Sequence, residues 1–492
     1  MPRSDRPAAV RPQPLSSTIE REIKLSVDAD FRLPPRLGTL LPRKLLTSTY
    51  YDTASYDLTH ARITLRHRVE RGKHAWQLKL PLCEDRQEVE VVDQHQRPPA
   101  SLCHLLVLHV GQRKLAPVAT LRVWRTGVRV QQRRSPVAEI VLDHVSVVKN
   151  GLVIQRFREL EIEQLADDDR AVQDLEQRLR QAGARDHDGR PKLFRALSLP
   201  APAPDRPPEP EAPIGDHVKW ALAQHVHWLL AHDPGTRLGL QSESLHQMRV
   251  ATRRLRAVLR AAEPVLSTDW AQALENELAW LSEFLAQARD LDVQLAYFEQ
   301  ESSRLDARDR KPLAQFIAHL RTQRERVQQL VQSELNSARY FDLVRRVQQA
   351  AGDPSIVDTT VTLHDLAKRE FKKLRRAIHS LPSSPNQAAL HKIRIKTKRA
   401  RYAAELAMWS VGKRATRFMK QARAVQDLLG SYQDSFTAET YIRAFLKQST
   451  SVRAGFMAGR MVERQRQRRH DVLARLKPKF TALLKKGRRA WQ

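Results

Sequence analysis

Hydrophobic and polar residues alternate with two different periods along this chain, and the change of period divides it. From residue 18 to about 165, short segments such as Ile19-Glu20-Arg21-Glu22-Ile23 alternate with period two, which indicates β-strands. From residue 214 to the end, apolar residues recur every three or four positions with few helix breakers, which indicates long helices. We therefore expect a mostly β region followed by an all-α region.

A proline-rich segment, residues 200–213 (PAPAPDRPPEPEAP), separates these two regions and is predicted to be an extended linker. A helix is expected over 168–183 and a further short element over 192–199. Residues 1–17 contain no apolar run, so they are predicted to be a flexible arm and not a secretory signal. The expected organisation is an arm (1–17), a first domain (18–199), the linker (200–213) and a second domain (214–492).

The helix predicted over 245–260 carries an apolar seam with a row of basic residues beside it. The seam recurs at the 3,4 spacing of a buried helix face and consists of Leu245, Met248, Thr252, Leu255 and Leu259. The basic stripe lies one position further along and consists of His246, Arg249, Arg253, Arg256 and Arg260. Like charges at these spacings repel by roughly 0.2–0.5 kcal/mol per pair. For a single helix, a solvated basic face explains this pattern as well as a binding face does.

The same arrangement returns at 390–405. The second seam is Leu390, Ile393, Thr397, Ala400 and Ala404, and the second stripe is His391, Arg394, Lys398 and Arg401. Aspartates follow at matching distances, because 44 residues separate His246 from Asp290 and 43 separate His391 from Asp434. We therefore expect two repeats in the second domain, about 214–350 and 351–492, and two matching stripes favour an anion-binding face.

The overall charge narrows the class of partner. The chain has 85 Lys and Arg against 55 Asp and Glu, a net charge of +30, which predicts nucleic acid, an acidic membrane surface or a polymer of phosphate as partner. The two cysteines, Cys83 and Cys103, are too few for a disulfide framework or a cysteine-based zinc site. No window approaches 18 uncharged apolar residues, so we expect no membrane span and a soluble, cytoplasmic protein.

Charged residues share one face of most strands predicted in the first domain, and apolar residues share the other. Charged positions of this kind are Glu20, Glu22, Lys24, Arg66, Arg68, Lys79, Glu88, Glu90, Glu139, Asp143, Glu159, Glu161 and Glu163. A half-exposed sheet would explain any one of these strands. All of them together, with both signs of charge, favour a closed antiparallel barrel with a charged lumen and an apolar outside partly covered by helices.

A lumen with acidic and basic walls suits phosphoanhydride chemistry. Carboxylates bind hard divalent cations such as Mg²⁺ or Mn²⁺. Arg and Lys bind phosphate oxygens, and Arg does so with two parallel hydrogen bonds. Hydrolysis then requires positioned phosphates, a metal that neutralises developing charge, and an activated water.

Residues 18–199 resemble the CYTH domain (the triphosphate tunnel fold). The motifs that carry the resemblance are Glu20-x-Glu22-x-Lys24, Tyr50-Tyr51-Asp52-Thr53, Leu65-Arg66-x-Arg68, Leu78-Lys79, Glu88-x-Glu90, Glu159-x-Glu161-x-Glu163 and Lys192-x-x-Arg195. That family includes inorganic triphosphatases, thiamine triphosphatases and a class of adenylate cyclases. The resemblance implies catalytic roles for Glu20, Glu22 and Lys24, and metal binding by Glu20, Glu22, Glu161 and Glu163. It implies triphosphate binding by Lys24, Arg66, Arg68, Lys79, Arg122, Arg125 and Lys192.

The repeated Leu-His-x-x-Arg-(x)3-Arg helix resembles the CHAD domain (conserved histidine α-helical domain) over roughly 214–492. The resemblance implies two four-helix bundles related by a pseudo-twofold axis, with a basic groove that binds inorganic polyphosphate. The residues predicted to bind it are His246, Arg249, Arg253, Arg256, Arg260, Lys372, Arg376, His391, Arg394, Lys398 and Arg401. The two histidines have either a structural role or a phosphate hydrogen bond. Asp290 and Asp434 are expected to orient stripe arginines by ion pairing.

The favoured interpretation is metal-dependent hydrolysis of tripolyphosphate by the first domain and polyphosphate binding by the second, with association with polyphosphate granules. The alternative is a polyphosphate-binding protein without turnover. A nucleic-acid binder is disfavoured, because aromatic residues are only 6% of the chain and none lies within 245–260. An adenylate cyclase would need a purine pocket. The basic tail from Arg460 to Arg489 either extends the groove or is a solvated helical face.

Overall fold

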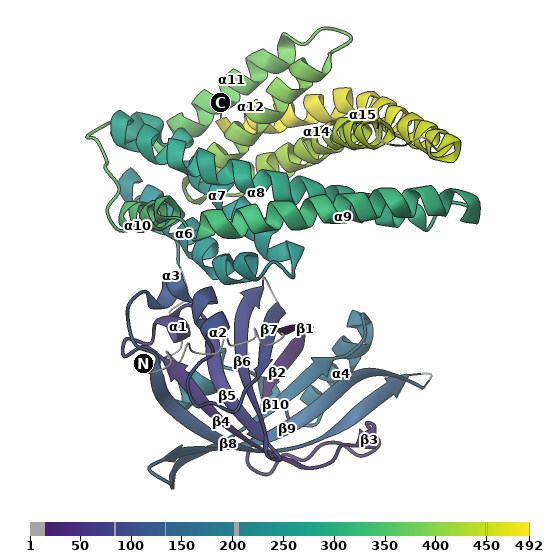
Figure 1. Cartoon of the computed structure of the whole chain (residues 1–492). Coiled ribbons are helices and arrows are strands. Elements are labelled where there is room, and N and C mark those ends of the chain that lie inside the picture. The colour runs from purple at the N-terminus through teal and green to yellow at the C-terminus, as the bar shows by residue number, and fades with distance from the viewer. Residues whose placement is uncertain are drawn as a thin grey trace, which may run out of the picture. The chain divides into compact units, whose positions relative to one another are not determined.

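The computed structural model describes residues 15–82, 85–132, 134–200, 206–447, 449 and 451–491 (Figure 1). It divides into two compact units, Met1–Asp205 with Leu230–Ser244, and Arg206–Leu229 with Leu245–Gln492. Most of the predicted arm, part of the linker (201–205) and Cys83 lie outside the described residues. Strands dominate the first unit and long helices the second, as the two hydrophobic periods predicted.

An 11-stranded antiparallel sheet forms the first unit, and ten of its strands follow one path in the order β1-β7-β6-β5-β4-β8-β9-β10-β2-β11. The last strand, β3, pairs with β8. Their bounds are β1 (Ser16–Glu20), β2 (Glu22–Ser26), β3 (Thr39–Leu40), β4 (Lys44–Asp52), β5 (Thr64–Glu70), β6 (Lys73–Leu82), β7 (Asp85–Val92), β8 (Ala116–Gln132), β9 (Ser135–Lys149), β10 (Leu152–Gln164) and β11 (Arg185–Asp186).

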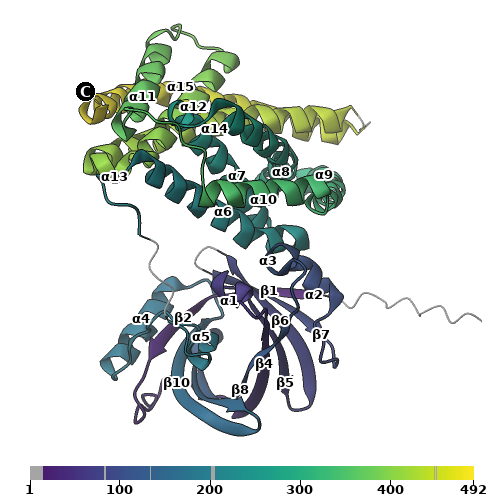
Figure 2. The same cartoon turned by 90° about the vertical axis from the view of Figure 1, so that its left-hand side faces the viewer.

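One N-terminal segment joins the two sides of this sheet. β1 and β2 are separated only by Arg21, yet β1 pairs with β7 and β2 pairs with β10. Because β7 and β10 lie near opposite ends of the strand order, the sheet must curl until this single segment borders both of them. Figure 2 shows the curled sheet nearly end-on. The hydrogen-bonded path stays open between β1 and β2, so the expected barrel is a curled sheet and not a continuous ring of ladders.

The apolar faces of the strands lie outside, under short helices. Leu65, Trp76 and Leu78 are buried against Leu102 and Leu105 of α2 (Ala100–Leu105). The apolar residues of β10 pack in the same way against α4 (Asp169–Gln181). Two further short helices, α1 (Asp57–His60) and α3 (Val107–Val110), lie on the same side of the sheet as α2 (Figure 1). The even-numbered positions of β5 and the odd-numbered positions of β6, such as Arg66 and Lys79, are thereby left to face the lumen.

The helix α5 (Lys192–Ala196) packs against residues that face the inside of the curled sheet. Its Leu193 and Ala196 belong to one buried cluster with Leu46, Val123 and Val145. The sequence predicted a short element here, but it did not predict that this element would cover an apolar part of the lumen. Because Lys192 is the first residue of α5, this packing determines where its ammonium group lies.

Long helices form the second unit, and the two stripe helices of the repeats are α7 and α12. The helices are α6 (Ile214–Leu238), α7 (Ser242–Ala261), α8 (Thr268–Ser302), α9 (Ala307–Leu335), α10 (Ala338–Gly352), α11 (Leu363–His379), α12 (Gln387–Leu406), α13 (Met408–Val411), α14 (Lys413–Leu446) and α15 (Val452–Trp491). None of the helices in the described part of the chain is long and apolar enough to traverse a lipid bilayer.

Both predicted seams are confirmed. Every seam residue of α7 and of α12 is buried. The two threonines make the same local hydrogen bond, because Thr252 Oγ1 donates to Met248 O and Thr397 Oγ1 donates to Ile393 O, each at 2.8 Å. A threonine hydroxyl is therefore accommodated in each apolar seam without losing a hydrogen bond.

Candidate functional site

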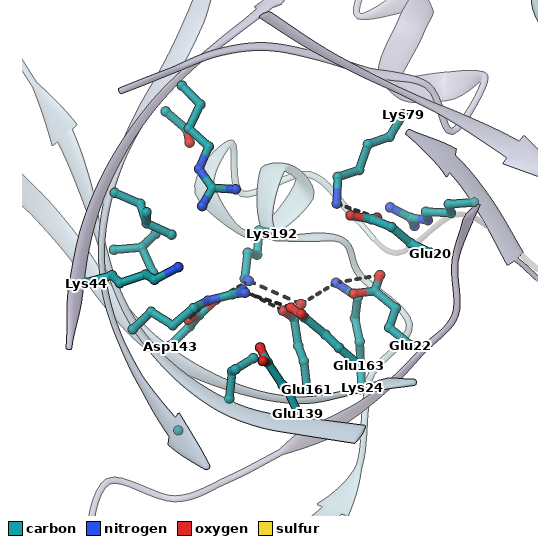
Figure 3. A pocket seen from close by; sticks show the side chains of 18 of the residues that line it. Glu20, Glu22, Lys24, Lys44, Lys79, Glu139, Asp143, Glu161, Glu163 and Lys192 are labelled. Atoms are coloured by element: carbon teal, nitrogen blue, oxygen red, sulfur yellow. Dashed lines mark hydrogen bonds and ion pairs between the residues drawn. The ribbon is translucent and has the colours of Figure 1, made fainter. Parts of the chain in front are cut away.

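A cavity of about 590 Å³ lies inside the curled sheet (Figure 3). Among the described residues, six acidic side chains line it: Glu20, Glu22, Glu139, Asp143, Glu161 and Glu163. Ten basic side chains line it as well: Arg21, Lys24, Lys44, Arg66, Arg68, Lys79, Arg86, Arg125, Arg129 and Lys192. The excess of cations makes the cavity suited to an anionic ligand that carries several charges.

Glu161 of β10 is the centre of an ion-pair network in this cavity. Its Oε1 accepts hydrogen bonds from Lys24 Nζ at 2.7 Å and Lys192 Nζ at 3.2 Å, and its Oε2 accepts one from Arg125 Nη2 at 2.9 Å. Burial would raise the pKa of Glu161, but Lys192, Lys24 and Arg125 hold it well below its ordinary value. Glu161 is therefore a carboxylate anion across the physiological pH range.

Lys192 reaches the same network from α5. Its Nζ lies 2.5 Å from Asp143 Oδ2 and 3.1 Å from Glu159 Oε2. Burial lowers the pKa of Lys192, but Glu161, Asp143 and Glu159 raise it well above its ordinary value. Glu159 is fully buried and also accepts a hydrogen bond from His187 Nε2 at 3.1 Å, with the proton on that nitrogen. The network thus fixes Lys192 as a cation beside several carboxylates.

Strands β5 and β6 supply a mainly basic wall. Lys79 Nζ lies 2.6 Å from Glu20 Oε2, and Arg66 Nε donates to Gln77 Oε1 at 2.8 Å. Arg68 Nη2 lies 2.9 Å from Glu70 Oε2, at the edge of the network. Burial, followed by repulsion from Arg66, lowers the pKa of Arg68, so this guanidinium has less compensating negative charge than Lys24 or Lys192.

The structure brings most of the predicted tunnel residues together. The cavity is lined by Glu20, Glu22, Lys24, Arg66, Arg68, Lys79, Arg125, Glu161, Glu163 and Lys192. Arg122 is the exception: it is exposed and does not line the cavity, whereas Arg125 does. The two lie three positions apart on β8, and a strand with period two places such residues on opposite faces. The expectation that Arg122 joins the basic wall is therefore not supported.

Sequence reasoning assigned no binding or catalytic role to several lining residues, namely Arg21, Lys44, Arg86, Arg129, Glu139 and Asp143. Glu139 and Asp143 had been recognised as neighbours on one face, but no role was assigned to them. Asp143 is nevertheless almost fully buried, and Arg125 donates to both of its oxygens, at 2.8 and 2.9 Å. The sequence could have predicted the position of Lys44, because Lys44, Leu46 and Ser48 alternate along β4 and therefore share one face of the strand.

The carboxylates of β2 and β10 have the right chemistry for a hard divalent cation. Glu22 and Glu163 are direct partners in the β2–β10 ladder, and oxygen ligands of this kind suit Mg²⁺ or Mn²⁺. Burial is the largest influence that raises the pKa of Glu163; Glu161 and Glu22 add to it, although Arg125 opposes them. The residues that the structure describes contain no group of three or more His, Cys, Asp or Glu poised around a metal. The carboxylate oxygens of β2 and β10 are thus suitable ligands for a divalent cation, and in this structure they form ion pairs with Lys and Arg.

The two basic stripes of the helical unit converge. Arg249 and Arg253 of α7 lie close enough to Lys398 of α12 for their charges to lower its pKa, and Arg394 of α12 in turn lowers the pKa of Arg249. Burial, then Arg394, Arg253 and Arg249, lowers the pKa of Lys398 to about 7. In the described part of the chain, neither a hydrogen bond nor an ion pair reaches Lys398 Nζ. The stripes therefore form a cationic face with incomplete internal neutralisation.

The matched aspartates accompany these stripes. Arg249 Nη1 lies 4.0 Å from Asp290 Oδ1. Burial raises the pKa of Asp434, whereas Arg394 is the largest influence that lowers it. Burial is also the largest influence that raises the pKa of Asp290, and Asp434 adds to it. Each aspartate thus lies near an arginine of its own half of the helical unit, and the prediction that both orient the stripes by ion pairing stays a prediction.

A second cavity, about 620 Å³ in volume, lies within the helical unit. Its basic lining residues are Arg253, Arg256, Arg260, Lys373, Lys398 and Arg399. His246, Arg249, Arg394, Arg401 and His391 do not line this cavity. Lys372 and Arg376, predicted to bind polyphosphate, are exposed on α11 and lie outside it, whereas their neighbour Lys373 lines it.

Fold and site together define a two-part protein: a curled-sheet tunnel with an ion-paired interior, and a helical unit with clustered cations. Family models match a CYTH domain over residues 18–188 and a CHAD domain over residues 221–443. The chain therefore contains a CYTH domain followed by a CHAD domain.

One relative is similar to this chain over both domains, and solved structures are similar to part of it. An uncharacterized protein of Mycobacterium tuberculosis strain H37Rv, Rv2226, is 27% identical over 478 residues and covers 90% of each chain. Among solved structures, the CHAD domain from the plant Ricinus communis is 25% identical, covering 58% of this chain and 97% of that one with a TM-score of 0.47. PptA from Streptomyces chartreusis is 20% identical, covering 55% of this chain and 100% of that one with a TM-score of 0.46.

Proposed function

We propose that the CYTH tunnel hydrolyses inorganic tripolyphosphate with Mg²⁺ or Mn²⁺, and that the CHAD domain binds inorganic polyphosphate. The observation that carries the proposal is the tunnel cavity of about 590 Å³, in which basic side chains exceed acidic ones and the carboxylates are gathered on neighbouring strands. A linear triphosphate has several negative charges, and such a cavity can surround it with charge-assisted hydrogen bonds.

Each wall of the tunnel has a role in this proposal. Arg66, Arg68 and Lys79 of β5 and β6 would bind phosphate oxygens and hold the chain in one position. Lys24 and Lys192 would neutralise the carboxylates of the acidic network and contact the phosphate groups of the bound triphosphate. Glu20, Glu22, Glu161 and Glu163 would hold the divalent cation. When bound, the cation supplies neutralisation of phosphate charge and a water of lowered pKa.

The CHAD domain has a cationic face suited to a longer polyanion. Arg249 and Arg253 of α7 and Arg394 and Lys398 of α12 lie together, and the second cavity continues from Arg253 to further basic residues. Inorganic polyphosphate presents phosphate groups without bases, so a cationic face poor in aromatic side chains suits it better than it suits single-stranded nucleic acid.

The test is phosphate release from tripolyphosphate in the presence of Mg²⁺ or Mn²⁺. We expect metal-dependent release by the wild-type chain, and its loss, by a factor of 100 or more, in Glu20→Gln/Glu22→Gln. The matched control is Asp174→Asn/Glu176→Gln on α4, outside the cavity, which we expect to retain wild-type activity. Equal activity in both double variants would refute a catalytic role for the tunnel carboxylates.

The alternative function is binding without turnover. It is favoured by one observation: Glu20, Glu161 and Glu163 are already paired with Lys and Arg, so a cation would have to displace these partners. Absence of phosphate release from tripolyphosphate, ATP and thiamine triphosphate, together with retained polyphosphate affinity, would establish this alternative.

A further inference from the structure

A third concentration of positive charge lies apart from the tunnel and the stripes, where α14 begins and α15 ends. A cavity of about 310 Å³ there is lined by Arg414, Arg417, Lys486 and Arg489. We call these four residues the basic clamp. None of them belongs to the stripes of α7 and α12, and no acidic side chain is among the described residues that line the cavity.

The packing of the two helices explains why these side chains meet. α14 and α15 run side by side (Figure 1), and each contributes two clamp residues that are three positions apart and therefore share a helix face. Trp491, at the end of α15, is fully buried with its ring 5.9 Å from that of Phe418 in α14. Gly487, between Lys486 and Arg489, allows α15 to lie directly against the ring of Phe371. The backbone around the clamp is thus held firmly.

The charges of the clamp are not neutralised within the chain. Among the residues that the structure describes, no hydrogen bond or ion pair reaches any of the four side chains. Like charges one turn apart cost roughly 0.2–0.5 kcal/mol per pair. The start of α14 adds to this cost, because its first turn contains no acidic residue, and its N-cap Gly412 has no side chain to accept a hydrogen bond. A bound anion would relieve the repulsion and interact favourably with the start of the helix.

We infer that the basic clamp is a separate binding site for the phosphate groups of a condensed phosphate chain. Three of its four side chains are arginines, which bind phosphate oxygens with two parallel hydrogen bonds. Within the described part of the chain, no aromatic side chain, on which the bases of a nucleic acid would stack, lines this cavity. The choice of condensed phosphate as ligand rests on the proposed function, but the position of the site does not.

Arginine footprinting locates this site directly. The full-length protein is treated with phenylglyoxal, with and without long-chain polyphosphate, and modification of each arginine is followed by mass spectrometry. We expect at least fivefold slower modification of Arg414, Arg417 and Arg489 when polyphosphate is present. Exposed Arg170 and Arg178 of α4 serve as references whose modification rate should not change.

The pattern of protection separates this inference from the proposed function. Protection of Arg253 and Arg394 without protection of the clamp would overturn the inference and leave the CHAD proposal intact. Protection of the clamp without protection of those stripe residues would support the inference and contradict the proposal that the stripes bind polyphosphate. A parallel arm with single-stranded DNA of equal charge distinguishes the ligand class, because protection by DNA equal to that by polyphosphate would refute a site for condensed phosphate.

Affinity measurements provide a second test. Arg414→Gln/Arg489→Gln should weaken binding of long-chain polyphosphate about tenfold and reduce its salt dependence, because two phosphate contacts are lost. The matched control is Arg308→Gln/Arg326→Gln on α9, which removes two exposed arginines elsewhere in the helical unit. Equal affinity of the two double variants, with unchanged thermal unfolding, would overturn the proposal.

Discussion

Glu22 of β2 and Glu163 of β10 are direct partners across an antiparallel ladder, so two carboxylates face each other inside the tunnel. Carboxylates directly opposite each other repel, and Glu22 contributes to the raised pKa of Glu163. A divalent cation between them would replace this repulsion with attraction. We therefore expect Mn²⁺ or Mg²⁺ to raise the midpoint of thermal unfolding of the wild-type chain, and chelation to reverse the effect.

This expectation has a specific counterpart in Glu22→Gln/Glu163→Gln. Without metal, the double variant loses both the repulsion and the ion pairs of Glu163 with Arg125 and of Glu22 with Lys24, so its unfolding midpoint should lie close to that of wild type. It should show less than half of the shift caused by Mn²⁺. Differential scanning calorimetry at several Mn²⁺ concentrations measures both effects. An undiminished shift would mean that the cation binds elsewhere. Asp174→Asn/Glu176→Gln on α4 controls for loss of surface carboxylates.

Arg66 and Arg122 form a matched pair for testing the basic wall. Arg66 lies in the cavity and donates to Gln77, whereas Arg122 is exposed on the other face of β8. Losing a buried charge-assisted contact to phosphate costs about 1.5–3 kcal/mol, so Arg66→Ala should lower kcat/KM for tripolyphosphate by roughly 10- to 100-fold. Arg122→Ala should change it less than twofold. Steady-state phosphate release measures both, and similar losses would contradict the assigned faces.

The stripes should contribute to polyphosphate affinity through their charge. Arg253→Ala/Arg394→Ala removes one arginine from each repeat, and we expect at least tenfold weaker binding at low salt. The dependence of log affinity on log salt concentration should become shallower, because fewer counterions are released. Titrations at three salt concentrations test this, with Arg308→Ala/Arg326→Ala as control. A parallel loss in the control would show only a nonspecific effect of net charge.

Lys398 should make polyphosphate binding depend on pH near neutrality. Its pKa is lowered to about 7 by burial and by Arg394, Arg253, Arg249 and Arg401, so its ammonium group loses its proton as pH rises through that value. A bound polyanion favours the protonated form, and binding should therefore be tighter at pH 6 than at pH 8.5. Lys398→Met should flatten this dependence. A wild-type profile that is already flat would refute the role of Lys398.

The same group has a consequence for folding. Lys398 binds its proton more weakly in the folded chain than at its ordinary pKa of 10.5, so between about pH 7 and 10.5 the unfolded state binds more protons. The contribution of this residue to stability therefore rises with pH across that window. It is smallest below pH 7, where the folded chain contains the charged lysine among arginines. Comparing the free energy of unfolding of wild type and Lys398→Met at pH 6 and 9 isolates this contribution.

Periodicity in the sequence was sufficient for the helical seams and for most of the tunnel wall. Leu245 and Leu390 are buried as predicted because a 3,4 spacing places apolar residues on one helix face wherever that face packs. Arg66 and Lys79 line the cavity because successive side chains of a strand point to opposite faces. Like the helix spacing, this rule depends only on neighbouring residues. Arg122 shows the limit of motif matching: its proximity to Arg125 suggested a shared wall, although a separation of three positions on one strand excludes it.

Other features depend on long-range packing that no local pattern reports. The position of Lys192 follows from α5 lying against Leu46 and Val123 of distant strands. Asp143 belongs to the ion-pair network only because β9 lies between β8 and β10, which places it beside Arg125 of β8. Lys192 reaches it from α5. These contacts join residues more than 15 positions apart, and their partners emerge only from the register of the sheet.

Gly487 and Gly459 of α15 provide a test of how closely the helices near the clamp are packed. A Cβ atom at Gly487 would lie 2.0 Å from Phe371 Cε2, which is buried and cannot withdraw without disturbing its neighbours, whereas nothing lies within 4 Å of a Cβ atom at Gly459. Overpacking a core costs about 1–3 kcal/mol, so Gly487→Ala should lower the free energy of unfolding. Gly459→Ala should raise it by about 0.5–1 kcal/mol, because alanine favours the helix. Denaturant unfolding of both variants measures this, and two changes of the same sign would contradict the close contact of α15 with Phe371.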